Sequence, residues 1–117
     1  MKNNQLVSLS KGFALDIFHL CDKIRKEGNS NAILNQLLRS GTSIGANIHE
    51  ANYASSKADF INKLQIALKE CYETDYWLSL FFEANLFDKE TYSSLFSNCC
   101  KIRRILIASI NTAKQNL

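Results

Sequence analysis

The sequence predicts an all-α protein, an antiparallel up-down-up-down four-helix bundle in which residues 1–117 form a single domain. The chain contains no proline and only four glycines, so long helices meet few interruptions. Four stretches repeat apolar residues with the period of an α-helix. The connections between these stretches are a few residues long, which favours antiparallel neighbours.

The first helix is expected from Leu9 to Lys26. Ser8 or Ser10 can cap its start, and Gly28 is the expected stop just beyond its end. The residues that recur on one apolar face are Phe13, Ile17, Leu20 and Ile24.

The second helix is expected to begin after a cap at Asn29 or Ser30 and to end near residues 51–52. Gly41 and Gly45 lie inside it, and each costs about 0.5–1 kcal/mol relative to Ala. Their slim surface predicts close approach of a neighbouring helix. The expected apolar face consists of Ile33, Leu37, Leu38, Ile44 and Ile48.

A short polar turn, residues 53–56, separates the second helix from the third. Ser55 or Ser56 can cap the third helix, with Asp59 in its first turn, and this helix is expected to reach Ala84. Its heptad-like core stripe is Phe60, Leu64, Ala67, Cys71, Thr74, Leu78 and Phe81. A second stripe on another face is Ile61, Leu68, Tyr72 and Tyr76.

Asn85 is expected to end the third helix in a left-handed conformation, and Asp88 to cap the fourth. The fourth helix repeats the heptad pattern, with a stripe of Tyr92, Leu95, Cys99, Ile102, Leu106, Ser109 and Ala113. Phe96, Ile107 and Ile110 extend beyond that stripe. The apolar surface exceeds what a monomeric bundle needs, which favours an oligomer.

The composition excludes several classes of protein. The formal net charge is +3, which allows a nucleic-acid partner without requiring one. The first residues lack an apolar signal core and no apolar run is long enough to span a bilayer, so we expect a cytoplasmic protein with no membrane contact. The four cysteines lack metal-ligand spacing, and we expect them to be reduced thiols packed as small apolar residues.

A polar stripe runs along the second helix at helical spacing. In an antiparallel hairpin centred on the turn, equal rise on both helices places Arg39 opposite Glu70, with Glu73 one turn further on. The stripe lies beside the face of Ile44 and Ile48, so we expect part of this polar seam to be buried. Because a buried Arg needs a partner, we expect Arg39 to be clamped by one or both acids, which would fix the helix register. The six residues of the seam are Arg39, Ser43, Asn47, Glu50, Glu70 and Glu73.

The same stretch contains the run LLRSGTSIGANIHE, a serine-rich turn, and a helix of the form FINKLQIALKECYE. This pattern resembles that of a bacterial family of four-helix-bundle proteins, the 23S rRNA intervening-sequence proteins. The resemblance covers about a third of the chain. At the end of the second helix His49, Ala51 and Asn52 depart from the usual Ala, Glu and Gly.

The resemblance implies a homopentamer and no known enzymatic activity. It also implies a relation to the accessory variability determinants of diversity-generating retroelements, which bind nucleic acid and a reverse transcriptase through a basic surface. We therefore expect a non-enzymatic oligomer that binds RNA or DNA by charge, with no cofactor. The alternative is a protein-interaction adaptor, for example for a reverse transcriptase, that binds no nucleic acid itself.

The candidate nucleic-acid contacts are the basic residues of the first and fourth helices, Lys11, Lys23, Arg25, Lys26, Lys101, Arg103 and Arg104. A catalytic or metal site is not expected. His49 and Glu50 are adjacent, whereas carboxylate metal sites in bundles use Glu-x-x-His pairs on two helices. His49 is interpreted as an ordinary residue of a helix face.

Overall fold

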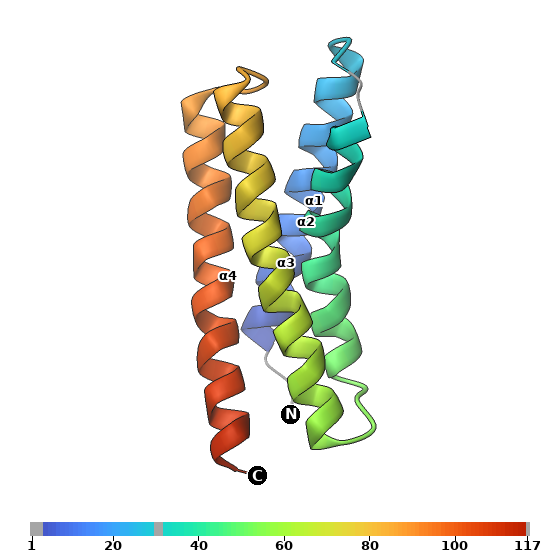
Figure 1. Ribbon diagram of the computed structural model, residues 1–117, viewed down its shortest axis with the longest axis vertical. Helices are drawn as coiled ribbons and strands as arrows, with labels where there is room; N and C mark the ends of the chain where they lie inside the picture. The colour runs from blue at the N-terminus through green and yellow to red at the C-terminus, as the bar shows by residue number, and fades with distance from the viewer. Residues whose placement is uncertain (1–3, 30–31, 117) are drawn as a thin grey trace.

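A computed structural model describes residues 4–29 and 32–116. It contains four helices, α1 (Asn4–Lys26), α2 (Ala32–Ala51), α3 (Lys57–Glu83) and α4 (Lys89–Gln115). Each helix packs against the next in the chain, and α1 also packs against α4. The α2–α3 turn lies at the same end of the bundle as the start of α1 and the end of α4 (Figure 1). The predicted up-down-up-down bundle is confirmed.

The helix boundaries follow local capping chemistry. The Ser56 hydroxyl accepts a hydrogen bond from the backbone N–H of Asp59 at 3.0 Å, and Asp88 accepts one from Thr91 at 2.8 Å, as N-caps do. Gly28 and Asn85 adopt positive φ values of 88° and 63°, the left-handed conformation that ends a helix. These four predicted boundaries are confirmed.

The predicted start of the first helix is wrong. α1 begins at Asn4, because Leu6 extends its apolar face by another turn and is buried. Ser8 and Ser10 therefore lie inside the helix and do not cap it. The Ser10 hydroxyl is buried and donates to the Val7 carbonyl at 3.2 Å. Ser30, one of the two residues predicted to cap the second helix, lies outside the described residues.

The core consists largely of the predicted faces, with exceptions near the helix ends. Leu34 is fully buried, whereas Ile33 is exposed and was wrongly assigned to the core. In the last turns of α4 Ile110 and Ala113 are buried, whereas Ser109 is only half-buried. The stripe of α4 thus drifts from a strict heptad, as expected for a straight helix with 3.6 residues per turn.

The predicted close approach occurs between α1 and α2. A Cβ placed on Gly41 would lie 2.9 Å from both γ-carbons of Ile17, and one on Gly45 would lie 3.3 Å from the carbonyl oxygen of Ser10. Among the described residues, none of the helices combines the length and apolar character needed to cross a membrane.

Candidate functional site

Arg39 on α2 joins the two acids of α3 that the hairpin geometry predicts. Its Nη1 donates to Glu70 Oε2 at 2.8 Å, and its Nη2 donates to Glu73 Oε2 at 2.7 Å. Trp77 Nε1 donates to the same Glu73 oxygen at 3.0 Å. Hydrogen bonding by Trp77, and further by Arg39, lowers the pKa of Glu73 against the opposing effect of burial. The side chain of Arg39 is 51% exposed, so the expectation of a buried arginine is wrong.

The rest of the seam is divided between two kinds of contact. The Asn47 amide donates to the Ser43 carbonyl of its own helix at 2.9 Å. Glu50 accepts from Lys63 Nζ of α3 at 2.8 Å, a partner that sequence reasoning missed. Arg39 and Glu50 therefore join α2 to α3 by ion pairs near the two ends of the stripe.

A buried hydroxyl pair lies beside the seam and was also missed. Ser40 and Thr74 are fully buried, and their oxygens lie 3.1 Å apart across the α2–α3 interface. Ser40 donates to the Leu37 carbonyl at 3.3 Å. Thr74 can donate to Ser40 or to the Glu70 carbonyl, which lies 2.8 Å away. The helical positions of both residues predict core, but nothing in the sequence pairs them.

Arg103 lies between α3 and α4. It forms an ion pair with Asp75, and its guanidinium carbon lies 5.1 Å from the centre of the Tyr72 ring. Its Nη2 lies 3.0 Å from Cys100 Sγ. Burial lowers the pKa of Arg103, but the interactions of its guanidinium with Asp75 and Cys100 together outweigh this effect, so the pKa is raised. Arg103 is thus engaged within the protein rather than presented outward.

The other candidate nucleic-acid contacts lie at different places on the bundle. Lys23, Arg25 and Lys26 lie in the last turn of α1, where Lys26 pairs with Asp22 at 2.9 Å and Arg25 contacts Asn35. The three remaining candidates are exposed, and they are Lys11, Lys101 and Arg104. The structure therefore does not gather the seven predicted residues into one patch.

Charge is instead separated along the length of the bundle. Dividing each helix near its middle gives a turn half, residues 4–15, 42–69 and 102–116, and a far half, residues 16–29, 32–41 and 70–101. The turn half holds seven basic and two acidic side chains, whereas the far half holds six basic and nine acidic ones. The sequence beyond Glu90 contains no acidic residue. The turn half is therefore the positively charged part of the molecule.

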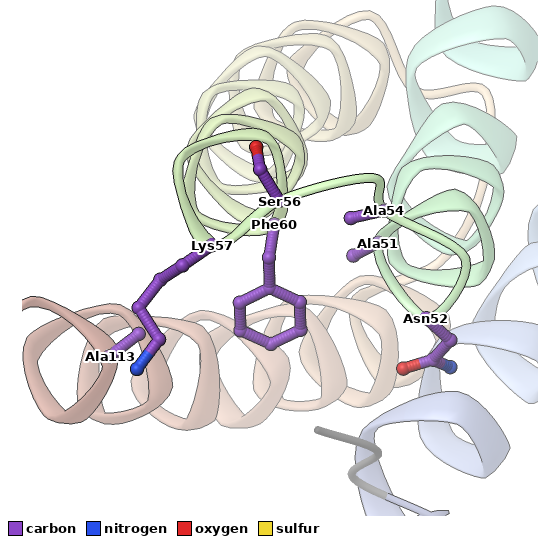
Figure 2. A pocket seen from close by; sticks show the side chains of 7 residues that line it. All are labelled: Ala51, Asn52, Ala54, Ser56, Lys57, Phe60 and Ala113. Carbon is purple, nitrogen blue, oxygen red and sulfur yellow. The ribbon is translucent and has the colours of Figure 1, made fainter. Parts of the chain in front are cut away.

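Of three hollows lined by described residues, two belong to the turn half. One, of about 250 Å³, lies between the α2–α3 turn and α4. Figure 2 shows the Phe60 ring directed from α3 toward α4, with Lys57 on one side and Ala51 and Ala54 of the turn region on the other. Lys57 Nζ donates to the carbonyl oxygen of Asn116 at 3.2 Å.

The second hollow of the turn half, of about 270 Å³, lies between α1 and α2 and is lined by Lys11 and His49 among others. The third, of about 370 Å³, lies in the far half between α1 and the α3–α4 connection, and its lining includes Asp16, Glu27 and Asp88. The two ends of the bundle thus offer hollows of different charge.

The cysteines are free thiols, and Cys21, Cys71 and Cys99 are buried. Burial raises the pKa of Cys21 to about 11. Hydrogen bonding with Cys71, together with burial, raises the pKa of Cys99. A thiol with a raised pKa is a poor nucleophile at neutral pH. Within residues 4–29 and 32–116, no three His, Cys, Asp or Glu side chains are grouped as metal ligands.

Comparisons with known proteins agree with this architecture. A family model described as 23S rRNA-intervening sequence protein matches residues 2–108. A crystal structure from Bacteroides thetaiotaomicron, described as a protein with unknown function from the S23 ribosomal protein family, is 45% identical to this chain. The similarity covers 95% of this chain and 99% of that chain, with a TM-score of 0.90. No curated protein matches the chain at a significant level.

Proposed function

This chain belongs to the family of 23S rRNA-intervening sequence proteins, and from its charge distribution we propose that it is a non-enzymatic bundle that binds the phosphate backbone of RNA or DNA. The observation that carries this proposal is the excess of basic side chains in the turn half. Nucleic acid releases condensed counterions when cationic side chains neutralise its phosphates, which drives binding without sequence recognition.

The turn half supplies cations that are free to reach a phosphate. Lys11, Arg104 and Lys114 are exposed and come from the first and fourth helices. Glu50, one of the two acids of this half, is neutralised by Lys63. The proposal moves the binding surface away from Lys23 and its neighbours, because their part of the bundle has more acidic than basic residues.

The test is a salt titration of binding to mixed-sequence RNA and duplex DNA, followed by fluorescence anisotropy. The triple variant Lys11→Gln, Arg104→Gln and Lys114→Gln should flatten the dependence of log K on log salt by about 2–3 units for duplex DNA. The matched control is Lys23→Gln, Lys26→Gln and Lys89→Gln, which removes the same charge from the far half. Absence of binding at low salt, or equal losses in both variants, would overturn the proposal.

A second property, self-association, is favoured by an apolar surface on α3 and α4. Tyr72 and Tyr76 of α3 are more than half exposed, and Phe96 and Ile107 of α4 are also exposed. Tyr72 reaches α4 through its contact with Arg103, so side chains of both helices contribute to one surface. Exposed apolar patches of this kind mark interfaces. We propose that copies of the chain associate here, and a pentamer is what the family resemblance implies.

Light scattering after gel filtration tests the association. Tyr76→Glu and Ile107→Glu should shift the protein toward the 13.3 kDa monomer. Leu15→Glu should not, although Leu15 on α1 is 52% exposed, between Tyr76 at 61% and Ile107 at 38%. A parent protein that elutes as a monomer at every concentration would contradict self-association. The same surface would then be free for the adaptor role, whose partner, such as a reverse transcriptase, a pull-down from the host would identify.

A further inference from the structure

The hollow between α1 and α2 has an apolar floor of small residues. Its apolar lining includes Ala14 of α1 and Gly45, Ala46 and Ile48 of α2, and the hydroxyl residues Ser10 and Thr42 also line it. Its volume of about 270 Å³ is just below the roughly 300–1,000 Å³ of pockets that hold drug-sized ligands. The space therefore suits one flat ring system rather than a larger molecule.

One ring of an exposed aromatic pair, that of His49, lines this hollow. The His49 ring centre lies 5.3 Å from that of Tyr53, at an angle of 52°. Tyr53 is 74% exposed, and no hydrogen bond holds its hydroxyl among the contacts of the described residues. Large exposed aromatic rings on basic surfaces are the platforms on which unpaired bases stack.

The charge around the hollow fits a polyanion. Lys11 lines it, and no acidic side chain does. Glu50, the acid nearest in sequence to His49, is held by Lys63 on α3. An apolar floor, a ring platform and a cation without a competing acid are the elements that bind single-stranded nucleic acid.

We propose that the α1–α2 hollow receives one unstacked base of a single-stranded RNA or DNA, with a second base stacked on Tyr53 and Lys11 bound to a phosphate between them. This proposal rests on the nucleic-acid binding proposed above and adds a preference for single strands. Duplexes hold their bases inside the stack, so they would engage the cations of the turn half but not the hollow or the rings.

The experiment compares the affinities of the full chain for a single-stranded oligonucleotide and for its duplex. Tyr53→Ala should weaken single-strand binding roughly 5- to 150-fold, the range for loss of one base–aromatic stack, and leave duplex binding unchanged. Tyr53→Phe should keep the affinity. Ala46→Leu, which fills the hollow from an exposed position, should also weaken single-strand binding. Phe18→Ala removes an exposed aromatic ring of the far half, 52% exposed on α1, and is the matched control.

A fluorescent base analogue, 2-aminopurine, placed once in the oligonucleotide gives an independent readout, because stacking quenches it. We expect quenching with the parent and with Tyr53→Phe, and none with Tyr53→Ala. Binding that is equal for both nucleic acids and indifferent to Tyr53 would overturn the single-strand site while leaving backbone binding intact. Loss of all binding would instead remove the proposed function. A single-strand preference that survives both Tyr53→Ala and Ala46→Leu would place the base site elsewhere and overturn the inference.

Discussion

The hydroxyl oxygen of Thr74 lies 3.1 Å from that of Ser40, across the interface of α2 and α3 and out of contact with water. Ser40 donates to the Leu37 carbonyl of α2, and the one hydroxyl proton of Thr74 goes either to Ser40 or to the Glu70 carbonyl of α3. Both hydroxyl protons therefore have acceptors inside an apolar core. A hairpin with a shifted register would separate the two hydroxyls and break the hydrogen bond between them.

Thr74→Val keeps the side-chain shape and removes the interhelical bond. Ser40 still donates to the Leu37 carbonyl, so we expect a loss of about 1 kcal/mol in the free energy of unfolding. Urea denaturation should show a lower midpoint with an unchanged slope. Thr42→Val is the control, because the Thr42 hydroxyl bonds only carbonyls of its own helix. Equal effects of the two substitutions would mean that the interhelical bond adds nothing.

Gly41→Ala should destabilise the protein by about 1–3 kcal/mol, the usual cost of overpacking. The new Cβ would lie 2.9 Å from two carbons of Ile17, a fully buried side chain that has little room to move. Gly12→Ala meets nothing within 4 Å and should stabilise α1 by about 0.5–1 kcal/mol. Thermal melting checks both, and the explanation fails if the two alanines shift the melting temperature in the same direction.

Arg39→Ala should cost about 1 kcal/mol, near the upper end for exposed ion pairs. The reason is that Glu70, with 12% of its side chain exposed, loses the partner that compensates its burial. Arg39→Lys should recover only part of the loss, since one ammonium group cannot match a guanidinium bonded to two acids. Lys26→Ala, which breaks an exposed pair within α1, should cost less than half as much. Chemical denaturation in low and high salt would show whether screening reduces the effect.

The lowered pKa of Glu73 predicts how the stability of the protein changes in acid. The pKa of Glu73 in the folded protein is lowered below the ordinary 4.5, so the ionised carboxylate stabilises the fold above that value. This contribution is lost as the pH falls through the folded-state pKa. The difference in unfolding free energy between the parent and Glu73→Gln should therefore be constant near neutrality and shrink in acid. Trp77→Phe removes the largest cause of the shift and should give an intermediate profile, measured by urea unfolding across the pH range.

Substitution by alanine should lower the stability of the protein at Arg103 but not at Arg104. Arg103→Ala leaves Asp75 without its partner, and Asp75 Oδ1 is already buried with no hydrogen bond among the described residues. We expect a loss of about 1.5–3 kcal/mol, the value for hydrogen bonds to charged groups. Arg104→Ala should leave stability unchanged and weaken nucleic-acid binding. Adding Asp75→Asn to Arg103→Ala should restore part of the stability; no recovery would show that the ion pair is not the cause.

The sequence predicts the end of a helix well where a residue at that end sets the boundary by itself. Gly28, Asn85 and Asp88 act through their own backbone or side chain, so local chemistry suffices. The start of α1 depends on tertiary packing instead. Leu6 has a place in the core only because other helices cover it, and two serines that look like caps are carried inside the helix.

The contacts of the candidate site likewise include one that the sequence could predict and one that it could not. The pairing of Arg39 with Glu70 follows from the rise of two helices around a known turn, so it could be predicted. The contact of Arg103 with α3 could not be predicted. Consecutive helical residues point about 100° apart, so neighbours in the sequence face different sides of the helix. Lys101, Arg103 and Arg104 are close in sequence, yet Arg103 alone of the three lies on the side that meets α3.

Charge separation along a bundle 49 Å long and about 20 Å wide has a consequence for any assembly with rotational symmetry. If the copies stand side by side with their long axes along the symmetry axis, all of their turn halves lie at the same end of the ring, on one rim. Such a ring would have one cationic and one acidic face, and a polyanion would approach it from a single side. Like charges also meet around each rim, so added salt would favour the closed ring while weakening its hold on nucleic acid.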